Sequence, residues 1–295
     1  CNRGRERRRD GGFRGVLEAL EERVLLSASV SVLVPAQIRS GYRFDQLAYN
    51  NGRQAIPADG RTQTIAVVDA FDDPNIAPDV DVFDRTFTWD KTVPYNLYTL
   101  FGPASGFLTK VSMAATPTPD PSWSQETALD VEWAHAIAPG AKILLVEAAS
   151  DSLTDLLAAA KWAATQNDVS VVSLSWGGSE FTAEWNDDLS LLTPAGHPGV
   201  TFVSAAGDQQ GASWPAASPY VLAVGGTSLL LDGTSYVGEA AWNETGGGTS
   251  AVETAPAFET ALTESATRTT PDVAYDANPE TGFYVYDSYA FEGQV

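Results

Sequence analysis

SQETALDVEWAHAIAPGAKI, residues 124–143, is the stretch that decides the fold. It predicts a helix that ends at Pro139-Gly140 and then leads into a strand. Within this helix, Glu126 and Asp130 stand four residues apart, so their side chains share one face. The pattern therefore sets two carboxyl groups side by side on one face of the predicted helix.

Two apolar residues, Trp133 and Ile137, fall on the same face as this pair when the helix turns by about 100° per residue. The opposite face predicts a solvent-exposed stripe made by Gln125, Glu132 and His135. Neighbouring carboxyl groups on an apolar face cannot both ionise easily, so their pKa values separate. Such pairs gather at working sites, although structural networks also produce them, and an isolated Glu/Asp pair usually marks a solvated face.

Apolar and β-branched runs alternate with helical patterns along the rest of the chain. We predict strands at 64–71, 142–149, 169–177, 199–208 and 220–229, and helices at 125–138, 152–166 and 183–192. This alternation predicts an α/β fold in which a mostly parallel β-sheet is flanked by helices on both faces. Ligands of such sheets bind at the carboxyl ends of the strands, where Asp69, Trp176 and Asp208 lie. After residue 230, the Gly-, Thr-, Pro- and Asp-rich composition predicts mainly loops.

The charge of the chain is acidic and unevenly distributed. Its 295 residues carry a net charge of −21, but residues 1–39 hold eight of the 17 basic residues and only five of the 38 acidic ones. The strongly acidic remainder repels nucleic acid and anionic membranes. It suits work in acid, and it equally suits plain solubility. No apolar run approaches the ~18 residues of a membrane span, and the single cysteine, Cys1, cannot form an internal disulfide.

The first 30 residues differ in composition from the rest. Residues 1–15 are basic and Gly-rich, which predicts disorder. The following segment, GVLEALEERVLLSASV, resembles a segment found near the start of many exported bacterial surface proteins, and an ordinary amphipathic helix is the alternative. We therefore expect a disordered N-terminus with an export or processing segment at 1–32, and one folded domain at 33–295.

Other candidates for chemistry are sparse. Asp208 in SAAGDQQG and Asp69 in VVDAFDD each follow an apolar strand, and each either caps a turn or points into the cleft. Neither His135 nor His197 has the His-Gly-Thr context of a Ser-His-Asp triad. The sequence contains no HExxH zinc motif and no nucleotide-binding glycine motif after a strand, so no metal ligands are assigned.

Six blocks in a fixed order carry a resemblance to a known family. They are ETALDVEWAHAIAPGAKILLVEA, VVSLSWGGSE, GVTFVSAAGD, SPYVLAVGGTSL, WNETGGGTS and PDVAYDANPETGFYVYDS. Together they resemble the sedolisin family of serine-carboxyl peptidases over residues 33–295. The resemblance implies a subtilisin-like α/β fold and hydrolysis of peptide bonds in acid.

The resemblance implies a role for the carboxyl pair. In sedolisins a glutamate replaces the histidine base and an aspartate one turn later orients it, and Glu126 and Asp130 match these positions. A free glutamic acid has a pKa of ~4.3, so it serves as a base only in acid or after burial has raised its pKa.

Three further positions carry roles implied by the resemblance. Asp208 matches the aspartate that stabilises the oxyanion, and it must be protonated to donate a hydrogen bond. Asp69 stands where relatives often place an acidic residue that supports the glutamate. Ser175-Trp176-Gly177 resembles the segment whose backbone pairs with an extended polypeptide substrate.

The nucleophilic serine has no accepted candidate. Ser250, in GGGTSAVETAP, precedes the block that begins at Pro271, whereas sedolisins place their serine after that block. We therefore expect the nucleophile beyond residue 295, which would leave this chain alone inactive, and we expect the Ca²⁺ ligands of the intact family domain there too.

Two functions from different classes follow. The first is an exported or cell-surface acid endopeptidase, expected to be monomeric, of which this chain is the N-terminal portion. The second is a non-catalytic surface or peptide-binding module on the same fold. A two-carboxylate glycosidase is weaker, because such enzymes set their acids about 5 Å or more apart on different elements.

Overall fold

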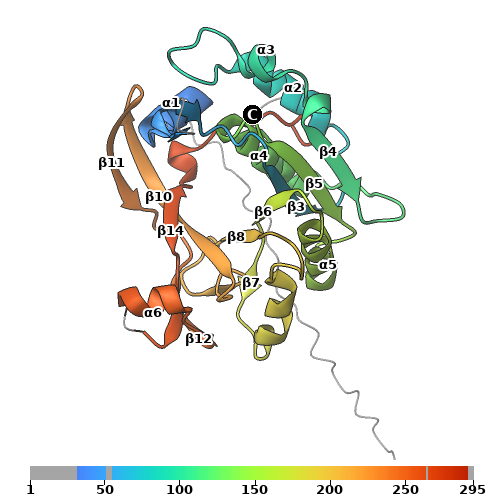
Figure 1. Ribbon diagram of the computed structural model, residues 1–295, viewed down its shortest axis with the longest axis vertical. Helices are drawn as coiled ribbons and strands as arrows, with labels where there is room; N and C mark the ends of the chain where they lie inside the picture. The colour runs from blue at the N-terminus through green and yellow to red at the C-terminus, as the bar shows by residue number, and fades with distance from the viewer. Residues whose placement is uncertain (1–31, 51–54, 264, 292–295) are drawn as a thin grey trace, which may run out of the picture.

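The computed structural model describes residues 32–50, 55–263 and 265–291 (Figure 1). The predicted export segment and nearly all of the N-terminal region lie outside these described residues. One sheet forms the centre, with the strand order β11-β10-β8-β6-β3-β5-β4 and with β14 paired to β10. Its strands are β3 (Thr64–Ala70), β4 (Leu108–Ser112), β5 (Lys142–Ala148), β6 (Val169–Leu174), β8 (Thr201–Ala205), β10 (Val221–Asp232), β11 (Ser235–Ala241) and β14 (Val273–Asp276).

All pairings in this sheet are parallel except that of β10 with β11. Parallel strands need crossover connections. Helices supply most of them here, whereas β8 is joined to β10 by a segment without a helix. The helices are α1 (Pro35–Gly41), α2 (Ile76–Thr86), α3 (Leu97–Phe101), α4 (Pro121–Ile137), α5 (Leu153–Ala164) and α6 (Ala257–Thr263), with short 3₁₀ helices η1 (Phe44–Gln46), η2 (Ala104–Gly106), η3 (Glu184–Leu191) and η4 (Pro279–Thr281).

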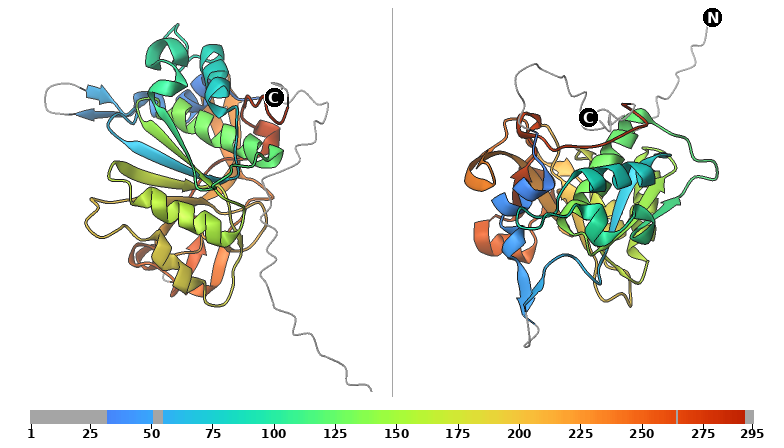
Figure 2. Two further views of the ribbon diagram at one scale, coloured as in Figure 1. Left: turned by 90° about the vertical axis from the view of Figure 1, so that its right-hand side faces the viewer. Right: turned by 90° about the horizontal axis from the view of Figure 1, so that it is seen from above.

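Helices cover both faces of the sheet, and the alternation of side chains along β3 explains why. Ala66 and Val68 pack into a core beneath α5, whereas Val67 joins the core beneath α2 and α4. Successive residues of a strand point to opposite faces, so a fully buried strand needs apolar residues at every position. The left view of Figure 2 shows α4 and α5 on opposite sides of the strands. The predicted α/β fold class is therefore confirmed.

The prediction of loops after residue 230 is wrong. The described chain there forms the end of β10, then β11, β12 (Gly248–Thr254), α6, β13 (Thr267–Thr270) and β14. β10 and β11 form a hairpin across Gly233, whose φ of 62° is the left-handed conformation that Asp-Gly turns favour. β11 is half-buried or exposed at every position, so it lacks the continuous apolar run by which the buried strands were predicted.

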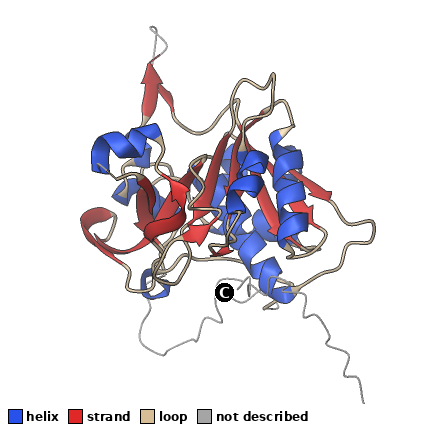
Figure 3. Cartoon of the chain, turned by 90° about the horizontal axis from the view of Figure 1, so that it is seen from below, coloured by secondary structure: helices blue, strands red, loops and turns tan. Residues whose placement is uncertain are grey.

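Three small two-stranded ribbons complete the fold. β1 (Ala48–Asn50) pairs with β2 (Ala55–Pro57), β7 (Gly178–Ser179) pairs with β9 (Ser213–Trp214), and β12 pairs with β13, all antiparallel. The β1–β2 ribbon projects away from the body (Figure 3). The β7–β9 ribbon joins the segments that follow β6 and β8, and it therefore lies at the carboxyl edge of the sheet.

Candidate active site

α4 brings Glu126 and Asp130 to the carboxyl edge of the sheet. The helix begins at Pro121, and its N-cap Asp120 accepts hydrogen bonds from the backbone N–H groups of Ser122 and Trp123 at 3.0 and 3.1 Å. Glu126 is 4% exposed. Asp130, one turn later, is half-buried, but its Oδ2 atom is shielded from solvent.

The predicted solvent stripe on α4 is wrong: Gln125 is half-buried, and Glu132 and His135 are fully buried. α2 and the segment after η4 cover this side of the helix. Asp84 of α2 lies 3.2 Å from His135, whose ring stacks on Phe107 at 3.7 Å. The backbone N–H of Tyr286 donates to Glu132 at 3.0 Å. The polar side chains on this side of α4 are buried against partners from other elements. A helical wheel shows only the helix itself, so it could not predict this burial.

Asp69 meets Asp130 across the interface of β3 and α4. Its side chain is fully buried, and it lies beside the Thr127 hydroxyl and the Asp130 carboxyl. Burial raises the pKa of Asp69 well above its ordinary range, and the nearby Asp130 carboxyl raises it further. Burial also raises the pKa of Asp130 to about 6, although the Ser175 hydroxyl beside it acts in the opposite direction. The structure therefore brings together Asp69, Asp130 and Ser175 from three elements.

Glu147 is a member of this site that the sequence reasoning missed. It stands directly opposite Asp69 in the register of β3 and β5. It accepts hydrogen bonds from the Asp73 backbone N–H at 2.9 Å and from Lys110 at 2.9 Å. Burial raises its pKa to about 7, against the opposing effect of Lys110. The signal was present, because the strand sequences VVDA and LVEA both place an acid one residue before their last alanine.

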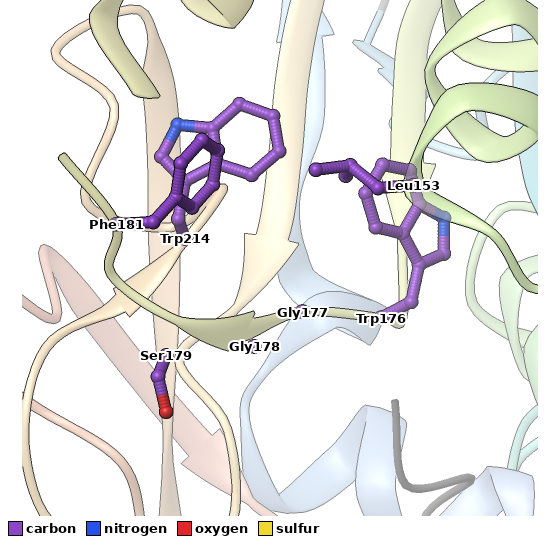
Figure 4. A pocket seen from close by; sticks show the side chains of 7 residues that line it. All are labelled: Leu153, Trp176, Gly177, Gly178, Ser179, Phe181 and Trp214. Carbon is purple, nitrogen blue, oxygen red and sulfur yellow. The ribbon is translucent and has the colours of Figure 1, made fainter. Parts of the chain in front are cut away.

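Ser175-Trp176-Gly177 leaves the end of β6 along the wall of a small apolar hollow. The Trp176 indole N–H donates to the Val68 carbonyl at 2.9 Å, which fixes the ring against β3. Figure 4 shows Trp176 and Leu153 on one side of the hollow, and Phe181 and Trp214 on the other. The predicted substrate segment therefore borders an aromatic hollow.

Asp208 lies in the loop that follows β8. The loop is pinned on both sides: the Gly246 N–H donates to the Gly207 carbonyl at 2.5 Å, and the Ser213 hydroxyl donates to the Ala206 carbonyl at 2.7 Å. A Cβ atom on Gly246 would lie 1.9 Å from the Ala206 carbonyl oxygen, so only glycine fits there. Because β3, β6 and β8 are adjacent and parallel, half-buried Asp208 lies at the same edge of the sheet as Asp69 and Ser175.

Ser250 has a structural environment of its own on β12. Its hydroxyl donates a short hydrogen bond to Glu180 and accepts hydrogen bonds from the backbone N–H groups of Val252 and Glu253 at 3.0 and 2.7 Å. These contacts lie within β12 between Thr249 and Thr254, where its pairing with β13 shifts register.

The described part of the chain shows neither a cluster of metal ligands nor a membrane span. It contains no group of three or more His, Cys, Asp or Glu side chains placed to hold a metal ion, so no calcium site is assigned there. None of the helices in the described ranges is both long enough and apolar enough to cross a bilayer.

Comparison with known protein families shows which family this chain belongs to. Residues 112–289, more than half of the chain, match the Subtilase family. The chain belongs to the subtilase family. Its relatives within the family are sedolisin-type enzymes, so the resemblance read from the six sequence blocks is confirmed.

Three curated relatives illustrate the match. Kumamolisin of Bacillus sp. (strain MN-32) is 30% identical over 292 residues, which cover 88% of this subtilase and 48% of kumamolisin. Xanthomonalisin of Xanthomonas sp. (strain T-22) is 29% identical over 59% of this chain and 28% of its own. Sedolisin of Pseudomonas sp. (strain 101) is 30% identical over 45% of this chain and 28% of its own. The chain thus spans about half the length of kumamolisin and less of the other two.

The fold of this subtilase also matches a solved structure. Pseudomonas sedolisin, a serine-carboxyl proteinase complexed with two molecules of pseudo-iodotyrostatin, superimposes with a TM-score of 0.69. The match covers 90% of this chain and 75% of that one at 23% identity. This likeness shows that the two chains share a fold.

Proposed function

We propose that this chain supplies the acidic catalytic groups of a sedolisin-type endopeptidase that hydrolyses peptide bonds at acidic pH. The observation that carries the proposal is the arrangement at α4. Glu126 is 4% exposed one turn before Asp130, and Asp130 touches Ser175 and fully buried Asp69. Buried carboxyl groups without enough cations retain protons, and retained protons are what acid-dependent catalysis requires.

In this mechanism Glu126 is the general base and Asp130 holds it in position through a shared proton. We expect the nucleophilic serine downstream of residue 295, in keeping with the order of the sequence blocks. As the serine oxygen bonds to the scissile carbonyl carbon, its proton passes to Glu126 and the carbonyl electron pair moves onto oxygen. When that pair returns, the C–N bond breaks and Glu126 gives the proton to the departing amine. Water then repeats the sequence on the acyl-enzyme, releases the acid product and regenerates the serine.

Asp208 would stabilise the negative oxygen in both halves of this reaction. It must carry a proton to donate, which limits activity to low pH. Asp69 would support the Glu126–Asp130 pair as a neutral acid, consistent with its raised pKa. The backbone of Ser175-Trp176-Gly177 would align the polypeptide substrate. We also propose that the enzyme is exported and acts as a monomer on polypeptides, and not on nucleic acid.

The test is hydrolysis of a denatured protein at about pH 4 by the full-length gene product. Glu126→Gln should lower kcat at least about a hundredfold, because it removes the base. Glu132→Gln is the matched control, since Glu132 is a buried glutamate on the same helix that accepts a backbone N–H. Activity that survives Glu126→Gln would refute the assignment of the base. Peptide binding without hydrolysis in both proteins would favour a non-catalytic peptide-binding module.

A further inference from the structure

A second group of buried carboxyls lies behind the aromatic hollow, away from α4. We name Glu180, Glu184, Asp188 and Glu253 the η3 carboxyl cluster. Glu184 and Asp188 belong to η3, Glu253 to β12, and Glu180 follows β7. The side chains of Glu184, Asp188 and Glu253 are 0%, 3% and 5% exposed. The proposed peptidase mechanism uses none of them.

Two members of the cluster hold the two aromatic residues on one side of the hollow. Glu184 accepts a hydrogen bond from the Phe181 backbone N–H at 2.8 Å. Asp188 accepts one from the Trp214 indole N–H at 3.0 Å, in a fully buried contact. The Phe181 and Trp214 rings in turn contact each other edge to face, with their centroids 5.7 Å apart. Both residues line the hollow beside Trp176 (Figure 4).

The other two members tie β12 to the same place. Glu253 contributes a carboxyl group that is in hydrogen-bond contact with Asp188. Glu180 accepts hydrogen bonds from the Ser250 hydroxyl and from the Ala251 backbone N–H. A contact between two carboxyl groups is favourable only while at least one of them carries a proton. The packing of β12 against η3 therefore depends on protonation.

Within the part of the chain that the structure describes, no Lys, Arg or His is paired with these carboxyls. The charges that act on Glu184 and Glu253 most strongly are other carboxyl groups of the cluster. α5, which packs on η3, carries two charged side chains, Asp155 and Lys161. Asp155 accepts from Ser150, and Lys161 lines a separate hollow.

The nearest buried cation on the β9 side is already paired. Arg268 bonds to Glu259 and Asp272, and it touches this region only through the Ala216 and Val221 carbonyls. The described residues include no set of acidic, cysteine and histidine side chains arranged to hold a metal ion. Among the groups that the structure describes around the cluster, protons on the carboxyls themselves are what lowers their mutual repulsion.

We propose that Glu184 and Asp188 are positioning residues that hold Phe181 and Trp214 as one wall of the substrate pocket only while the η3 carboxyl cluster is protonated. The description of the hollow as a substrate pocket rests on the proposed peptidase function, whereas the effect of protonation on the wall does not. The hollow has room for a group of about the size of one water molecule, so its lining of aromatic rings and Leu153 would take the tip of an apolar side chain of a polypeptide. The N–H groups of Phe181 and Trp214 by themselves favour ionised carboxylates. Ionisation of the whole cluster would nevertheless set like charges against each other in a buried place, and this repulsion would release the wall. Acidity would thus control substrate binding separately from the catalytic carboxyls.

The pKa values agree with this direction. Burial raises the pKa of Glu184 to about 8 and that of Glu253 to about 7, and neighbouring carboxyl groups add to both shifts. The contribution of such groups to local stability is complete below their unfolded pKa, near 4.5. It is lost as the pH rises through the folded pKa values, so the wall should loosen between pH 4.5 and about 8.

Hydrogen exchange of the Phe181 amide in the full chain tests the proposal. After correction for intrinsic exchange, protection should fall with rising pH, by at most about tenfold per pH unit for each group released, and level off at about pH 8. Glu184→Gln keeps an acceptor without a charge, so protection should persist with a shallower slope. Glu184→Ala should lose protection at every pH. Glu253→Gln should also reduce the slope.

Glu132→Gln provides the reciprocal control, because Glu132 holds the Tyr286 amide by the same kind of bond. Glu132→Gln should change the pH dependence of protection at the Tyr286 amide. Protection of the Phe181 amide should have the same pH dependence as in the wild type. A Phe181 slope that is flat in the wild type, unchanged in Glu184→Gln, or equally reduced by Glu132→Gln overturns the proposal. Because exchange is read without substrate, failure of the peptidase function leaves this result standing, and a flat slope leaves the peptidase function standing.

Discussion

The carboxyls around α4 and the η3 carboxyl cluster differ in what surrounds them. At α4, Lys110 lies 2.9 Å from Glu147, and burial raises the pKa of Glu147 to about 7 against this cation. In the η3 carboxyl cluster, Glu184 meets a backbone N–H and further carboxyls, and its pKa rises to about 8. Burial is the first cause in both places; the Asp73 N–H and Lys110 oppose it at Glu147, whereas neighbouring carboxyls add to it at Glu184.

The difference teaches that acid dependence need not reside in one site. The α4 carboxyls lie where strands end and chemistry would occur, whereas the η3 carboxyl cluster lies behind a pocket wall. The first group would act on the rate of the reaction, and the second on the affinity for substrate. Experiments that separate kcat from KM therefore sharpen the comparison.

The largest effect is expected at the oxyanion position. Asp208→Ala should lower kcat of the full-length enzyme by about 10²–10³-fold, because one oxyanion donor is worth that much. Asp208→Asn keeps a donor that needs no added proton, so it should retain more activity and extend activity toward neutral pH. The measurement is kcat across pH 3–7 for both variants. Equal loss in both variants would remove Asp208 from this role.

The stability of the fold should fall as the pH rises. Glu147 and Glu184 have folded pKa values of about 7 and about 8, above the ordinary 4.5. Their contribution is therefore complete below about pH 4.5 and lost as the pH rises through 7–8. Tm should drop by several degrees between pH 4.5 and 8, since about 1 kcal/mol corresponds to roughly 2–4 °C in a domain of this size. A Tm that rises over this interval would contradict the direction of these shifts.

A smaller effect should appear at Asp130 when its hydroxyl neighbour is removed. The Ser175 hydroxyl lowers the pKa of Asp130, so Ser175→Ala should raise it above about 6. One hydrogen bond is worth about 1 kcal/mol, which predicts a shift of roughly half a unit to one unit. Carboxyl-carbon NMR titration measures it, and Glu184→Gln serves as the control that leaves Asp130 unmoved. A downward shift would contradict the contact.

The smallest effect concerns the start of α4. Asp120→Ala removes the cap on Ser122 and Trp123 and should cost about 1 kcal/mol of unfolding free energy. Urea denaturation at pH 4.5 measures this. Asp130 lies on the same helix, roughly three turns from the cap. Its pKa, measured as the midpoint of its NMR titration, should therefore not change. A loss well above ~2 kcal/mol would mean that the cap also orders the active-site end of the helix.

Sequence periodicity predicted the strands that build the sheet, because buried parallel strands are continuously apolar and have distinct ends. It failed on the sides of α4, where Glu132 and His135 find buried partners in Tyr286 and Asp84, distant in sequence. It failed again after residue 230, where strands with an exposed face have the composition of loops.

The candidate site shows the same limit. Glu126, Asp130 and Asp208 could be singled out from helical spacing and strand ends together with a family resemblance, and their catalytic roles remain predictions. The η3 carboxyl cluster could not be predicted, since Glu184 and Glu253 come together only through the folding of separate segments. Its members look like solvated acids in the sequence because no local pattern marks them as buried.

The measurement that tests the central claim most directly is the titration of Asp130 in the full chain by carboxyl-carbon NMR. The account holds that the buried carboxyls beside α4 keep their protons in the acid range. It predicts a midpoint at about pH 6 for Asp130, with Asp69 still protonated at that pH. A midpoint near the ordinary value of 3.8 would contradict it.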